Sequence, residues 1–124
     1  MKDIATREDV QLLVDRFYKK VLEDDVIGFI FKKTINFIWE KHIPTMYDFW
    51  DSMLFNTAVY KGNPMVKHIV LHAKIELTDE RFDRWILLWE KTIDENFKGE
   101  KATLAKQKAI MMRKLMLHKI KQGS

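Results

Sequence analysis

The stretch TDERFDRWILLWEKTIDENF, residues 78–97, decides the fold class of this chain. Its apolar side chains recur three or four positions apart, which is the spacing that lines one face of an α-helix. They are Phe82, Trp85, Ile86, Trp89, Ile93 and Phe97. Thr78 supplies a hydroxyl cap before them, and two acids in the first turn favour the helix dipole. We predict a helix here that ends at Gly99.

The same spacing extends towards both ends of the chain. Residues 6–23, TREDVQLLVDRFYKKVLE, open with a capping box in which Asp9 replaces the usual glutamate. A break is expected near Asp24 and Asp25, followed by a short segment through Phe31. Further helices are expected from about residue 36, with a bend or helix start near Pro44, then after a loop at 59–64, and finally over about 100–120.

Length and composition limit the architecture. With 124 residues the chain suits one domain, which we assign to residues 1–124. Only four glycines and two prolines occur, and alternating runs typical of strands are lacking. We therefore predict an all-α domain with long helices and short connections.

The composition also excludes several classes of protein. Cysteine is absent, so disulfides, thiolate metal sites and cysteine nucleophiles are excluded. No apolar run approaches the ~20 residues of a membrane span, and no secretory leader is recognisable, so we expect a cytoplasmic protein without a membrane partner. Serine is scarce and no glycine-rich phosphate loop occurs. The sequence therefore offers no candidate nucleophile for a hydrolase and no phosphate-binding motif for a nucleotide-dependent enzyme.

The C-terminal part of the chain is basic. Residues 98–121 hold eight lysines or arginines against the single acid Glu100. Apolar residues interrupt these charges at helical spacing, so a solvated helix face is the expected interpretation. Base-stacking aromatics are missing there, and we expect no nucleic-acid partner.

Ring side chains fall on the apolar faces of successive predicted helices, in the order Tyr18, Phe31, His42, His68 and Trp85, and all of them except Phe31 are polar. Inward polar rings in a short helical chain are typical of a protein that holds a large flat cofactor, and we interpret the cofactor as haem. A neutral histidine is a common iron ligand, and His68 is the candidate. Tyr18 and Trp85 carry donors that can reach a ligand on the opposite side.

Other interpretations of the histidines were weighed. A lone histidine on a helix is more often a surface or structural residue than a ligand. His68 and His72 form H-x-x-x-H, a spacing that zinc sites use, but Glu76 is only a distant candidate for a third ligand. The haem interpretation therefore leads, and zinc stays a minor alternative.

Four stretches together resemble the group III truncated haemoglobins: FYKKVLEDDVIGFIF (17–31), WEKHIPTMYDFW (39–50), YKGNPMVKHI (60–69) and FDRWILLW (82–89). The resemblance implies a two-over-two helical sandwich around haem b. It assigns the iron to His68, and it makes Tyr18, His42 and Trp85 the distal, catalytic groups. The residues expected to contact the cofactor are Phe31, His42, Met46, His68, Phe82 and Trp85.

The resemblance also implies a function. Small ligands such as O2, NO or CO are expected at the iron, in reactive oxygen or nitrogen chemistry rather than oxygen transport. Turnover as an NO dioxygenase or a peroxidase-like catalyst would need an external reductase or oxidant. Two alternatives stay open: a cofactor-free helical interaction module with a basic last helix, and an engineered haem catalyst on the same scaffold.

Overall fold

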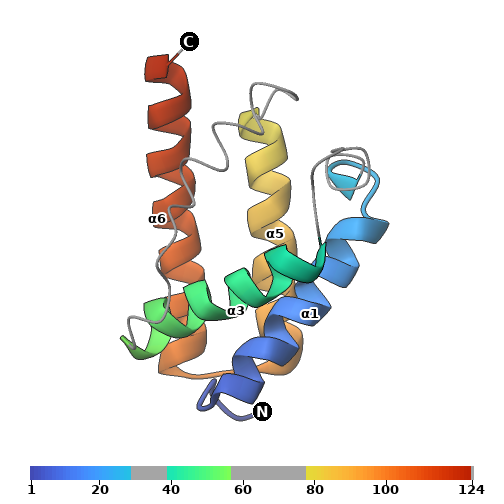
Figure 1. The fold of residues 1–124 in the computed structure, drawn as a ribbon, viewed down its shortest axis with the longest axis vertical. Coiled ribbons are helices and arrows are strands. Elements are labelled where there is room, and N and C mark those ends of the chain that lie inside the picture. The colour runs from blue at the N-terminus through green and yellow to red at the C-terminus, as the bar shows by residue number, and fades with distance from the viewer. Residues whose placement is uncertain (29–38, 57–77, 124) are drawn as a thin grey trace.

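The structure is a computed structural model, and it describes residues 1–28, 39–56 and 78–123. These residues form helices α1 (Arg7–Glu23), α3 (Trp39–Phe55), α5 (Asp79–Asn96) and α6 (Glu100–Gly123), drawn in Figure 1. The described residues contain no strand. The predicted all-α class is thereby confirmed for this part of the chain.

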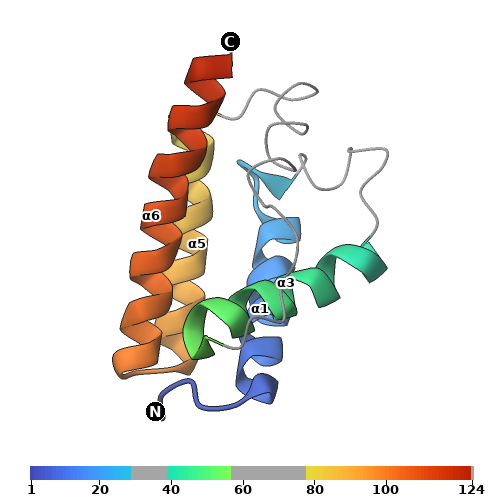
Figure 2. The same cartoon turned by 60° about the vertical axis from the view of Figure 1, so that its left-hand side comes forward.

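The helices form two layers of two. α5 and α6 run side by side in opposite directions, and α3 crosses them near the end where they are joined (Figures 1 and 2). α1 contacts both α3 and α5, and α3 also contacts α6. Each layer therefore buries its apolar face against the other, which is the packing that the periodic stripes predict.

The first helix begins as the sequence predicts. The Thr6 hydroxyl accepts a hydrogen bond from the Asp9 amide at 3.2 Å, and the Asp9 carboxylate accepts one from the Thr6 amide at 3.1 Å. This reciprocal pair is the predicted capping box. α1 ends at Glu23 with Asp24 as its extended C-cap, so the predicted break is also confirmed.

The end of α5 differs from the prediction. Thr78 caps the helix as expected, accepting from the Arg81 amide at 3.2 Å, but the helix ends at Asn96 rather than at Gly99. Phe97 turns to an extended backbone, which places its side chain in the core at 4% exposure. Burial of Phe97 therefore takes precedence over continuing the helix, and Gly99 lies in the short link to α6.

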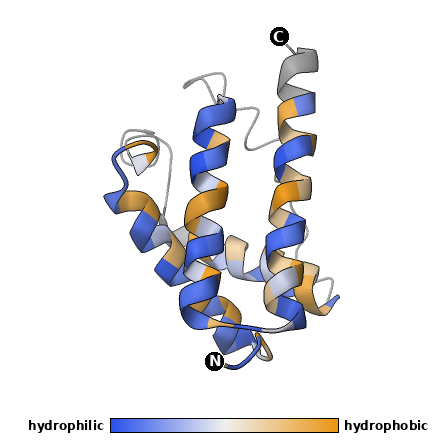
Figure 3. Ribbon diagram, turned by 180° about the vertical axis from the view of Figure 1, so that it is seen from behind, coloured by the Kyte–Doolittle hydropathy of each residue, from blue (hydrophilic) through white to orange (hydrophobic). Residues whose placement is uncertain are grey.

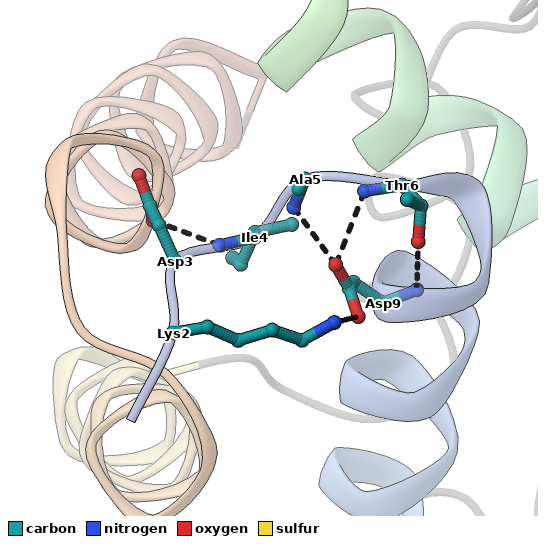
Figure 4. Close-up of polar contacts among 6 residues, drawn as sticks. All are labelled: Lys2, Asp3, Ile4, Ala5, Thr6 and Asp9. Carbon is teal, nitrogen blue, oxygen red and sulfur yellow. Dashed lines mark hydrogen bonds and ion pairs between the residues drawn. The ribbon is translucent and has the colours of Figure 1, made fainter.

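The N-terminal arm contacts the starts of both α1 and α6, and Figure 4 shows the polar contacts between the arm and the start of α1. The Asp3 carboxylate accepts hydrogen bonds from the amides of Lys101 and Ala102, both at 2.9 Å, in the first turn of α6. Lys2 forms an ion pair with Asp9 at 2.9 Å. The arm thus satisfies amide groups at the starts of both α1 and α6, which otherwise lack partners within their helices.

Gly99 is required by this arrangement. Its φ is +147°, a conformation that side chains other than glycine rarely adopt, and a Cβ there would lie 2.5 Å from Cγ of Asp3. The glycine therefore permits both the turn into α6 and the close approach of the capping carboxylate.

Aromatic rings fill the interface between the two layers. Trp89 is completely buried, and its indole stacks on Trp50 of α3 with ring centroids 4.4 Å apart. Its N–H donates to the Ala105 carbonyl of α6 at 3.1 Å. Trp89 therefore joins α3, α5 and α6 at one point. Figure 3 shows that polar and apolar residues are mixed along both α5 and α6.

Pro44 lies inside α3, five residues after its start at Trp39. We expected a bend or a helix start close to this proline. The helix begins five residues earlier and continues through the proline to Phe55, so a helix start at Pro44 is wrong, whereas the expected bend stays a prediction.

Candidate functional site

Tyr18 lies towards the C-terminal half of α1 and is buried, with 7% of its surface exposed. Burial raises the pKa of its phenol far above the ordinary value of 10.0. The phenol is therefore held neutral at any physiological pH, and its O–H can act as a donor. A neutral buried donor is what the predicted distal role of Tyr18 needs.

Phe17 connects Tyr18 to Trp85 of α5. Its ring meets Tyr18 edge to face at 5.0 Å and meets Trp85 edge to face at 5.4 Å, measured between centroids. Such edge-to-face pairs are favourable because the positive edge of one ring lies against the negative face of the other. Tyr18 and Trp85, 67 positions apart in the sequence, thus both contact one ring.

Met46 of α3 and Phe82 of α5 extend this apolar group. Their exposed fractions are 8% and 7%, and both belong to the same core cluster as Tyr18. Trp85 is only partly buried and packs against that cluster. Four of the predicted site residues, from three helices, therefore belong to the one apolar core or pack against it. We call Phe17, Tyr18, Met46, Phe82 and Trp85 the distal cluster.

The remaining predicted site residues cannot be placed. Phe31 and His68 lie outside the described residues, as does His72 of the zinc alternative. His42 belongs to α3 by its backbone, but the described side chains of that helix begin at Ile43. The roles of Phe31, His42 and His68 therefore stay predictions.

A charged corner adjoins the distal cluster. One oxygen of the Asp24 carboxylate accepts from Arg84 of α5, at 2.8 Å from Nε and 2.6 Å from Nη2. Burial by itself would raise the pKa of Asp24, but hydrogen bonds from Arg84 and from the Ile27 and Val26 amides outweigh it and lower the pKa. Asp24 is therefore ionised and ties the end of α1 to the start of α5.

The predictions from sequence did not include this corner or the central position of Phe17. Phe17 was expected only as one member of an inward stripe. Asp24 and Arg84 are 60 positions apart, and no local pattern links a helix-ending acid to an arginine on a later helix. The only sequence signal near this ion pair is that Arg84 directly precedes Trp85, one of the predicted site residues.

The chemistry of the distal cluster fits one face of a haem. Its walls are aromatic or thioether groups, and its polar atoms include a neutral phenol donor and an indole donor, without a carboxylate or ammonium group among its five members. A flat apolar macrocycle with a weakly polar ligand matches these properties. Groups of three or more histidine, aspartate or glutamate residues able to hold a metal by themselves do not occur in the described ranges.

The basic last helix uses several of its charges within the chain. Lys106 pairs with Asp94, and Arg113 pairs with Asp83 at 2.6 Å. The Lys101 ammonium donates to the Leu54 carbonyl at the end of α3 at 2.7 Å. These contacts link α6 to α5 and α3. The acidic partners Asp94 and Asp83 are 64% and 65% exposed, so the two ion pairs lie on a solvated helix face, as expected. In the described parts of the chain, no helix is long and apolar enough to cross a membrane.

Comparison with known proteins agrees with this arrangement. The chain is 29% identical over 113 residues to the group 3 truncated hemoglobin ctb of Campylobacter jejuni, an alignment that covers 89% of this chain and 87% of that protein. The crystal structure of the group III truncated hemoglobin from Campylobacter jejuni superposes with a TM-score of 0.84 at 27% identity, covering 97% of this chain and 95% of that one. The similarity confirms the two-over-two fold and the resemblance to group III truncated haemoglobins.

Residues 2–121 match the bacterial-like globin family. The match spans nearly the whole sequence, including α1, α3, α5 and all but the last two residues of α6. The chain therefore belongs to the bacterial-like globin family, and membership of that family implies that it binds haem.

Proposed function

We propose that this chain holds haem b through His68 and binds O2, NO or CO beneath the distal cluster, in reactive oxygen or nitrogen chemistry rather than oxygen transport. The observation that carries the proposal is that Tyr18 of α1 and Trp85 of α5 both contact the ring of Phe17, at 5.0 and 5.4 Å between centroids. Two neutral donors at one apolar wall suit a small ligand that gains partial negative charge.

When bound, the haem supplies an iron atom with an open coordination position for a diatomic ligand. Tyr18 then donates its phenolic proton in a hydrogen bond to that ligand, and the indole N–H of Trp85 offers a second donor. Met46 and Phe82 exclude water from the same wall, which strengthens each hydrogen bond. His42 and Phe31 are proposed as a further distal group and a ring packed on the cofactor.

Two donors favour retention of the ligand over its release. Each net hydrogen bond is worth about 1 kcal/mol, and each ~1.4 kcal/mol slows dissociation about tenfold. A ligand that leaves slowly suits a reaction at the site better than delivery elsewhere. Repeated turnover would draw electrons from an external reductase or an oxidant of the peroxide class.

Absorption spectra of ferric, ferrous and CO-bound protein test the proposal. We expect a haem band near ~400 nm that shifts on reduction and on CO binding, as in other histidine-ligated haem proteins. The variant His68→Gly should lose this pattern and regain it when imidazole is added, because free imidazole can replace the missing ligand. The variant His118→Gly, at an exposed position on α6, is the matched control.

Two results would contradict the proposal. Folded protein that does not take up haemin would favour the cofactor-free interaction module. An unchanged spectrum in His68→Gly would assign the iron to another side chain.

A further inference from the structure

We propose that the Asp24–Arg84 ion pair is a positioning device for the distal donors, which holds Trp85 at a fixed place relative to Tyr18. The inference rests on the proposed function, because it assumes that Tyr18 and Trp85 donate to the bound ligand. It concerns two residues that do not belong to the distal cluster and act only through it.

Asp24 uses both carboxylate oxygens, each towards a different element. One oxygen binds Arg84, whereas the other accepts from the amides of Val26 and Ile27, both at 3.0 Å. Only 3% of the side chain is exposed. Asp24 is thus the C-cap residue of α1 and also the cap of the turn that follows it. An acid that is shared in this way can shift only if both elements shift with it.

The turn beyond Asp24 cannot take up such a shift. Ile27 is 2% exposed and belongs to the core, and the Gly28 amide donates to the Asp24 carbonyl at 3.0 Å. A Cβ on Gly28 would lie 3.0 Å from the carbonyl oxygens of both Val21 and Leu22. The corner is therefore packed against the end of α1, and Arg84 is attached to a rigid anchor.

Arg84 immediately precedes Trp85, so its attachment restrains the first half of α5. Trp89, one turn later, is fixed by its stack on Trp50 and its bond to Ala105. Trp85 is less enclosed: it is partly exposed and lies parallel to Trp89 at a centroid distance of 6.3 Å. Trp85 is thus the less restrained of the two tryptophans, and it is the one that directly follows Arg84 of the ion pair.

A second polar link between the same two helices provides a control. Lys20 of α1 pairs with Glu95 of α5 at 2.8 Å. The cations of the two pairs are similarly exposed, 38% at Arg84 and 30% at Lys20, so the pairs differ in the carboxylate, which is 3% exposed at Asp24 and 48% exposed at Glu95. Exposed pairs contribute little to structure, whereas removing one partner of a buried carboxylate leaves an uncompensated charge. Loss of the Lys20–Glu95 pair should therefore leave the distal cluster unchanged.

The test compares Arg84→Gln, Asp24→Asn and the control Glu95→Gln with the unaltered haem-loaded protein. The readouts are the O2 dissociation rate and the C–O stretching band of the CO-bound form, which reports donors near the ligand. We expect Arg84→Gln and Asp24→Asn to speed O2 dissociation about threefold to tenfold and to shift or broaden the band, since a displaced donor makes a weaker hydrogen bond. Arg84→Lys should show a smaller change than Arg84→Gln, because it keeps the positive charge. The control Glu95→Gln should behave like the unaltered protein.

A third readout does not depend on the cofactor. The near-ultraviolet circular dichroism of the haem-free protein reports the packing of its tryptophans, and we expect it to change in Arg84→Gln but not in Glu95→Gln. A general loss of folding would appear as a lower unfolding midpoint in urea. Should Arg84→Gln fold poorly, Arg84→Lys supplies the comparison instead.

Trp85→Phe separates failure of this inference from failure of the proposed function. If Trp85→Phe moves the C–O band but Arg84→Gln and Asp24→Asn do not, the positioning role is overturned and the proposed function stands. If Trp85→Phe leaves both ligand readouts unchanged, the donor role of Trp85 is overturned, and the positioning role is overturned with it.

Discussion

The carboxylate of Asp3 accepts a hydrogen bond from the backbone amide of Ala102 at 2.9 Å, across 99 positions of sequence. The residue that caps α6 is thus contributed by the opposite end of the chain. This cap therefore forms only where the N-terminal arm meets the first turn of α6.

Removal of this cap should lower stability. We expect Asp3→Ala to reduce the free energy of unfolding by about 1–2 kcal/mol, the usual cost of losing a capping side chain. Urea denaturation followed by circular dichroism measures the loss. Glu100→Ala, at an exposed acid of the same helix turn, should cost less, and equal losses in both variants would contradict the capping role.

A side chain at Gly99 should be more damaging. Gly99→Ala forces a non-glycine residue to φ +147° and places its Cβ 2.5 Å from Cγ of Asp3. Backbone strain of this kind costs about 1–3 kcal/mol. In the double variant Asp3→Ala/Gly99→Ala the contacts with Cγ and Oδ2 of Asp3 disappear, whereas the 2.7 Å contact with Cβ and the backbone strain persist. The double variant should therefore lose less stability than the sum of the two single losses. Strict additivity would show that the two residues do not interact.

Stability should fall in acid through three carboxylates. Burial opposes the effect at Asp3, Asp9 and Asp24, but hydrogen bonds and nearby cations outweigh it and lower each pKa below the ordinary value of 3.8. The unfolded chain therefore binds more protons than the folded one below that value. The contribution is complete above about pH 5 and is lost as the pH falls through 3.8 to the folded pKa values.

Urea midpoints measured from pH 3 to pH 6 would follow this loss. Asp9→Asn should give a flatter profile than the unaltered protein, because one of the three carboxylates no longer titrates. If the profile of Asp9→Asn is as steep as that of the unaltered protein, titration of Asp9 does not contribute to the loss of stability in acid.

Local features of the fold could be predicted from sequence, and distant pairings could not. The Thr6 and Asp9 capping box and the Thr78 cap involve residues three positions apart, so their pattern is visible in the sequence. The end of α5 was predicted three residues too late, because burial of Phe97 depends on the whole core rather than on the nearby glycine.

The same division applies to the candidate site. Tyr18, Met46, Phe82 and Trp85 were expected to face inward from the periodicity, and the structure confirms their burial or packing on the core. Their assembly around Phe17 depends on how α1 crosses α5, which no local pattern specifies. The predicted roles at Phe31, His42 and His68 concern side chains outside the described residues and stay predictions.

The stack of Trp89 on Trp50 should be a main source of stability. Trp89→Phe removes part of a fully buried ring and its bond to the Ala105 carbonyl, and we expect a loss of about 1–3 kcal/mol. Leu87→Ala, two positions earlier on α5 but 53% exposed, should cost less than ~0.5 kcal/mol. Comparable losses in the two variants would contradict the central position of Trp89.

The most direct test of the account is the O2 dissociation rate of Tyr18→Phe, measured by stopped flow on the ferrous protein. Loss of one buried donor worth about 1 kcal/mol should speed dissociation about fivefold, while the fold is kept because only the hydroxyl is removed. Tyr47→Phe is the matched control, since the Tyr47 phenol donates to Asp15 at the surface rather than into the distal cluster. A change of about fivefold in Tyr18→Phe with none in Tyr47→Phe is the predicted result, and an unchanged rate in Tyr18→Phe would contradict the distal assignment.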